Sequence, residues 1–124
     1  MLLLAIGVFT QSEDDGGKAE FLAIRTCISQ SGNQTLCDQF LECGYELPTP
    51  VAVADVTCIY TIHPRGPGNC SSHEELYGDT ETRAKITACV DRTQTRTLTD
   101  EQNKQMEDFK QCVRNVGKAC LEKN

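Results

Sequence analysis

The residues with the most chemistry in this chain are eight cysteines, which are spread along the sequence instead of gathering at one place. They are Cys27, Cys37, Cys43, Cys58, Cys70, Cys89, Cys112 and Cys120. The closest two are separated by five residues, so the chain has neither the C-x₂₋₄-C pairs of a zinc site nor a C-x-x-C redox pair. An even number of widely spaced cysteines predicts disulfides, which persist in oxidising compartments outside the cytosol. We therefore predict four disulfides in a secreted, extracellular protein.

Other residue types offer little catalytic chemistry. The two histidines, His63 and His73, are the candidates for a general base or a metal ligand. One follows an expected helix and the other lies at an expected helix start, so we interpret both as solvent-facing. The stretch after His73 lacks the second histidine of H-E-x-x-H, since Tyr77 stands in its place, and no G-x-S-x-G occurs. The acidic stretches 13–16 and 79–81 do not continue into an EF-hand loop. We predict no catalytic residues, no metal site, no cofactor and no enzymatic activity.

The first nine residues are apolar, and polar Thr10, Gln11 and Ser12 follow them. Such a run is shorter than the about 20 residues that span a bilayer, but it suits the apolar middle of a secretory signal. We predict a signal peptide over residues 1–12, incomplete at its start because no positive charge precedes the run. A single domain would then occupy residues 13–124. The alternative is a buried strand or helix at the N-terminus.

The composition limits both the core and the partners. Leu, Ile, Val and Phe make up less than about 20% of residues 13–124 and Trp is absent, so burial alone would give a marginal fold. Four disulfides, each worth about 2–4 kcal/mol, would supplement it. The net charge of −6 disfavours nucleic acid and anionic membranes, so we predict no nucleic-acid partner and no membrane insertion. Two N-x-S/T sequons predict glycosylation at Asn33 and Asn69, although Cys70 inside the second competes by forming a disulfide.

Apolar spacing predicts an all-α domain of four to five short helices cross-linked by disulfides. Helices are expected over residues 18–30, 34–43, 80–91 and from 99 onward, where a capping box (Thr99 to Gln102) precedes an apolar stripe. Residues 51–62 are rich in β-branched side chains, yet Thr49 and Pro50 suit an N-cap and a first helical position, so we favour a helix over a strand. A second capping box predicts a short helix over 72–77. The intervening segments 14–17, 63–72 and 93–97 are expected to be a flexible leader, a loop and a connector.

Two glycines and four cysteines refine this expectation. Gly44 is expected to cap the second helix, and Gly117 to loosen the end of the last one. Within one helix, Cys37 and Cys43 would be about 9 Å apart along the axis, and Cys112 and Cys120 about 12 Å apart, so neither pair can bond. Many of the roughly 105 connectivities that eight cysteines allow remain open.

The C-terminal region, with its Thr99-to-Gln102 box, Met106, Phe109, Cys112 and Cys120, resembles small helical cysteine-rich proteins secreted by arthropods. These include the tick antimicrobial microplusin and proteins of spider and centipede venoms and spider secretory glands. The resemblance covers about the last 35 residues and implies a secreted helical protein of venom or saliva. Microplusin-like proteins have six cysteines and withhold copper through His-rich ends. This chain has eight cysteines and no histidine at either end, so that activity is carried over to no residue.

These observations lead to the hypothesis of a secreted, non-enzymatic binding effector, toxin-like, that acts on an extracellular protein target. The alternatives are a carrier of a small apolar ligand, an antimicrobial defence protein, and a structural component of a gland secretion or silk. The carrier lacks the C-x₃-C step of odorant-binding proteins and has few apolar residues to line a cavity. The negative charge weakens the antimicrobial alternative.

Overall fold

The computed structural model describes the backbone of residues 11–122 and the side chains of residues 17–122. Within this range the chain forms helices α1 (Gln11–Ser29), α2 (Gln34–Glu42), α3 (Thr49–Ile62), α4 (Thr80–Thr93) and α5 (Asp100–Glu122). A 3-10 helix, η1 (Cys43–Glu46), continues α2. The all-α prediction is confirmed. Strand-like pairing among the described residues is limited to two isolated bridges within the loop that joins α3 to α4.

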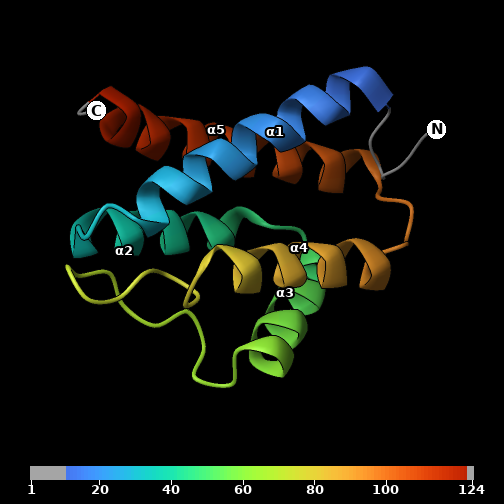
Figure 1. Cartoon of the computed structure of the whole chain (residues 1–124). Helices are drawn as coiled ribbons and strands as arrows, with labels where there is room; N and C mark the ends of the chain where they lie inside the picture. The colour runs from blue at the N-terminus through green and yellow to red at the C-terminus, as the bar shows by residue number, and fades with distance from the viewer. Residues whose placement is uncertain (1–10, 123–124) are drawn as a thin grey trace.

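In the view of Figure 1, helix α1 crosses α5, and α4 lies below both of them. On one side, Glu20 forms an ion pair with Arg114 at 3.0 Å and Cys27 is bonded to Cys120, so α1 and α5 run in the same direction. On the other side, Lys18 forms an ion pair with Asp91, at the end of α4 far from the loop that precedes it. Helix α4 therefore runs opposite to α1. Helix α3 packs against α4 on the side away from α1 and α5 (Figure 1).

The core draws on all five α-helices, and its larger part lies where α1, α2 and α5 meet. Its members are apolar residues at helical spacing and buried cysteines, among them Ile24, Ile28, Leu36, Phe40, Val113 and Val116. The ring of Phe21 lies 6.1 Å from that of Phe40 and 5.9 Å from that of Phe109, centroid to centroid, which is a favourable spacing for aromatic pairs. The apolar stripes predicted for these three helices are thus the faces that the fold buries.

Gly117 has a different role from the one expected. It is buried in α5 opposite Ile24 of α1. A Cβ atom at this position would lie only 2.8–2.9 Å from three side-chain carbons of Ile24. The glycine therefore allows close approach of the two helices, and the expectation that it merely loosens the helix end was wrong.

Local signals set most helix starts. The Asn33 side-chain oxygen accepts the Leu36 N–H at 3.1 Å, as expected of an N-cap. The Thr99 box forms in full, since the Gln102 side chain accepts the Thr99 N–H at 2.9 Å and the Thr99 hydroxyl accepts the Gln102 N–H at 3.1 Å. Residues 49–62 are helical, but the N-cap is Pro48, one residue before the expected Thr49.

Three further expectations were wrong. The leader over 14–17 is part of α1, which begins at Gln11. Gly44 does not cap α2, because the chain continues there into η1. The predicted signal peptide is not one of these errors, since its residues 1–10 lie outside the described residues.

The third error is the short helix over residues 72–77, where the chain forms successive turns. The Leu76 N–H binds the Ser29 carbonyl and the Tyr77 N–H binds that of Pro67, so contacts distant in sequence take donors that a helix would use. Tyr77 has a left-handed φ of 59°, which a helix excludes. The Ser72 hydroxyl contacts the His73 ring at 3.0 Å instead of capping a helix.

Candidate functional site

The structure pairs all eight cysteines, and each bond joins different elements. Cys27–Cys120 joins α1 to α5, and Cys43–Cys112 joins η1 to α5. Cys37–Cys70 joins α2 to the loop after α3, and Cys58–Cys89 joins α3 to α4. Neither Cys37–Cys43 nor Cys112–Cys120, the two pairs that the helix rise excludes, is formed. Every α-helix carries at least one disulfide bond. The bonds therefore hold the helices, and the surfaces that the helices expose, in one fixed arrangement.

One such surface is the outer face of α3. Val53, Val56 and Tyr60 are 59%, 55% and 53% exposed, and their spacing places them on one side of the helix. The opposite side carries Ala54, Cys58 and Ile59, which are buried. Exposed apolar side chains on one face are typical of a protein-binding surface. We call these three exposed residues the α3 face.

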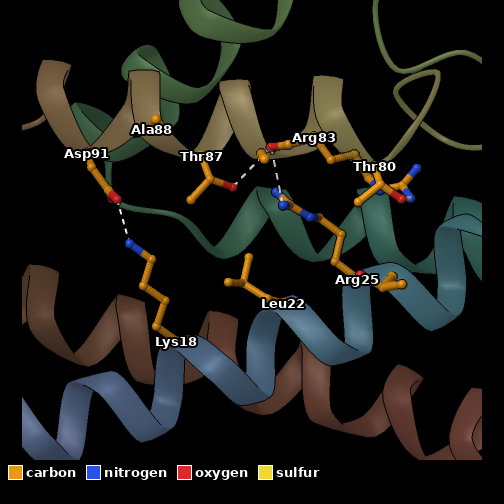
Figure 2. Close-up of a pocket in the computed structure, with 10 residues that line it drawn as sticks. Lys18, Leu22, Arg25, Thr80, Arg83, Thr87, Ala88 and Asp91 are labelled. Atoms are coloured by element: carbon orange, nitrogen blue, oxygen red, sulfur yellow. Dashed lines mark hydrogen bonds and ion pairs between the residues drawn. The ribbon is translucent and has the colours of Figure 1, made fainter.

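A second feature is a groove of about 380 Å³ between α1 and α4. Two links cross it in Figure 2: Lys18 reaches Asp91 at 2.6 Å, and Arg25 donates to the Arg83 backbone carbonyl at 3.3 Å. Leu22 of α1 and Thr87 and Ala88 of α4 lie between these links (Figure 2). The groove thus has charged ends and a largely apolar middle.

Arg83 anchors one end of the groove. Its side chain is almost fully buried, and its guanidinium donates to the Leu76 carbonyl at 2.8 Å, the Glu75 carboxylate at 3.0 Å and the Thr80 hydroxyl at 3.1 Å. It holds the irregular loop before α4 against that helix. A buried arginine with these acceptors is a satisfied structural group.

Arg25 is less well satisfied. It is 9% exposed, its Nε has no hydrogen-bond partner among the described residues, and its guanidinium lies 5.5 Å from the Phe21 ring centroid. Burial lowers the pKa of Arg25, and the same cause raises the pKa of Asp55 and of Tyr77 above their usual values. Arg25 forms no ion pair with any carboxylate whose side chain the structure describes.

The two arginines were missed in the sequence, although a signal existed. Arg25 lies between Phe21 and Ile28 on the apolar stripe of α1, and Arg83 precedes Ile86 by one turn on that of α4. A charged residue inside a core stripe is the pattern that would have identified both.

The residues singled out from the sequence lie apart from this groove. His63 is half-buried and contacts the Gly66 carbonyl in the loop after α3, so the expectation that it faces solvent was wrong, whereas His73 is exposed as expected. Asn33 caps α2, and Asn69 is exposed in the loop. Between residues 11 and 122 no three potential metal ligands gather, and none of the helices there is long and apolar enough to cross a membrane.

Fold and cross-links together define a small all-α protein stapled by disulfides. The family model Hi1a-like, described as U10-hexatoxin-Hi1a, matches residues 16–121. The chain therefore belongs to the Hi1a-like family, which supports a toxin-like cysteine-rich protein. No curated protein and no solved structure matches it. The expectation of a toxin-like cysteine-rich protein is confirmed at this level, over a far longer stretch than the C-terminal resemblance covers.

Proposed function

We propose that the protein is a secreted, non-enzymatic effector that acts by binding an extracellular protein target. The observation that carries this proposal is the toxin-family match over residues 16–121. Four disulfides in a small helical domain support secretion, because such bonds persist outside the cytosol. A signal peptide over residues 1–12 and glycans on Asn33 and Asn69 belong to the same proposal.

The α3 face is the part of the surface we assign to the target. Helix α3 carries a single charged residue, Asp55, in a chain of net charge −6. Depletion of charge and the presence of tyrosine mark the centres of protein interfaces. The Cys58–Cys89 bond fixes α3 on α4, so the face would bind without the entropic cost of ordering a mobile helix.

Binding of the labelled, disulfide-intact protein to membrane fractions from nerve, muscle and epithelium tests this proposal. We expect saturable binding in at least one fraction, displaced by unlabelled protein. Val56→Glu should weaken it at least about tenfold by placing a charge at the interface centre. Leu121→Glu is the matched control, because Leu121 is 51% exposed on a different helix.

Two results would count against the proposal. If no fraction binds saturably, the protein-binding function itself is refuted. If binding is saturable but Val56→Glu and Leu121→Glu have equal affinity, the effector role stands and its assignment to the α3 face is wrong.

A further inference from the structure

The groove between α1 and α4 has features of a ligand site separate from the α3 face. Its volume of about 380 Å³ lies within the range of about 300–1,000 Å³ that is usual for small-molecule sites. Its lining includes Lys18, Arg25, Arg83 and a single carboxylate, Asp91. A concave surface with more cations than anions is notable in a protein of net charge −6, because it would attract anions that the remaining surface repels.

The charges in the groove are not equally compensated. Lys18 is paired with Asp91, and Arg83 is paired with Glu75. Arg25 has one long hydrogen bond to a backbone carbonyl and a neighbouring aromatic ring, and its Nε is unpartnered among the described residues. Leaving a guanidinium buried without a counterion is costly, so Arg25 would be stabilised by an incoming anion.

No described side chain replaces that anion. Asp55 is the carboxylate that acts electrostatically on Arg25, but it lies beyond ion-pair distance. Burial raises the pKa of Asp55, the charge of Arg25 opposes this rise, and the two groups interact at a distance too long for an ion pair. Tyr77 is held neutral by burial. Glu75 is already committed to Arg83.

The side chains in the middle of the groove determine which chemical group can accompany the anion of a ligand. Leu22 and Ala88 line the middle of the groove beside Thr87, whose hydroxyl donates a hydrogen bond to the Arg83 carbonyl at 3.2 Å. The links at Lys18 and Arg25 cross the groove on both sides of these residues (Figure 2), so an extended peptide could not pass along it. An apolar segment of limited length therefore suits this space.

We propose that the groove between α1 and α4 binds an amphipathic organic monoanion, with a carboxylate on Arg25 and a short hydrocarbon tail against Leu22 and Ala88. A carboxylate matches the planar donors of a guanidinium. One uncompensated cation calls for one negative charge, which favours a carboxylate over a doubly charged phosphate. This inference concerns a small ligand and is independent of the protein target proposed for the α3 face.

Titration of the intact protein with octanoate, followed by ¹H–¹⁵N correlation spectra, tests the proposal. We expect saturable shifts of the Leu22, Thr87 and Ala88 amides. Octanol supplies the tail without the charge, and acetate supplies the charge without the tail. Each should bind at least about tenfold more weakly, a difference of about 1.4 kcal/mol.

Variants of the protein test the binding of the ligand's carboxylate and of its hydrocarbon tail separately. Arg25→Gln should abolish the preference for octanoate over octanol. Ala88→Phe, which fills the groove and leaves Arg25 in place, should weaken octanoate binding at least about tenfold. Lys85→Gln, which removes an exposed cation of α4 outside the groove, should have no effect. If Arg25→Gln fails to fold, Ala88→Phe decides. The proposal is overturned if octanoate causes no saturable shift, if octanol binds equally well, or if Ala88→Phe binds like the wild type.

Discussion

The contact between Gly117 and Ile24 predicts that Gly117→Ala destabilises the protein, although alanine is the better helix former. Replacement of glycine by alanine inside a helix ordinarily stabilises it by about 0.8–1.0 kcal/mol. Here the new methyl would lie 2.8–2.9 Å from three Ile24 carbons, which is far inside van der Waals contact. Overpacking of this kind costs about 1–3 kcal/mol. The difference between the two effects is a net loss of about 1 kcal/mol, or about 4 °C in Tm.

Another helical glycine, Gly17, and the Ile24→Ala variant provide the controls. Gly17 lies in α1, and a Cβ there would meet nothing within 4 Å apart from its chain neighbours and the backbone of its own helix, so Gly17→Ala should stabilise by about 1 kcal/mol. Ile24→Ala removes the three clashing carbons and itself costs about 2–5 kcal/mol. In that background Gly117→Ala should change sign and stabilise by about 1 kcal/mol.

Guanidinium unfolding followed by circular dichroism, with the disulfides intact, measures these differences from the midpoints. The double-mutant cycle isolates the coupling of Gly117 with Ile24 from the cost of either change alone. The reasoning fails if Gly117→Ala is as stable as the wild type, or if it causes the same loss with alanine at position 24.

Three further changes follow from the fold. Arg83→Met should cost about 1–3 kcal/mol because it leaves a buried carbonyl without a donor, whereas exposed Arg92→Met should stay within about 0.5 kcal/mol; equal midpoints in urea would contradict this. Replacing Cys58 and Cys89 by alanine opens a loop with a sequence separation of 31 and should cost about 3–4 kcal/mol in thermal unfolding; a loss below about 1 kcal/mol would argue against this bond. The backbone N–H of Thr82 lowers the pKa of Asp79 in the folded protein. The ionised Asp79 carboxylate therefore stabilises the fold above its ordinary pKa, and this stabilisation is lost as the pH falls through the folded pKa. Asp79→Asn should accordingly lose less stability than the wild type between about pH 6 and pH 3, and an unchanged pH dependence would refute this.

Short-range patterns accounted for the helices and for several of their starts. The Thr99 box and the Asn33 cap involve residues three apart, so the sequence contains both partners of each bond. The exclusion of Cys37–Cys43 and Cys112–Cys120 also needed only the rise of one helix. The disulfide chemistry followed from the number and spacing of the cysteines.

The short helix expected over residues 72–77 shows where such patterns stop being sufficient. Its capping box is present in the sequence, but the Leu76 N–H binds Ser29, which is remote in the chain. The loop is also fixed by the bond of Cys70 to Cys37. Local propensity contributes only fractions of a kcal/mol per residue, and contacts of this kind exceed it.

The sequence alone determined that this is a helical chain cross-linked by disulfides, because periodicity, capping and cysteine spacing act over a few residues. Only the tertiary structure decided which cysteines pair, that Gly117 admits Ile24, and that Arg25 lies buried beyond ion-pair distance of every carboxylate with a described side chain. These outcomes depend on how α1 is placed between α4 and α5. That placement comes from packing between segments some 60–90 residues apart, and no local pattern encodes it.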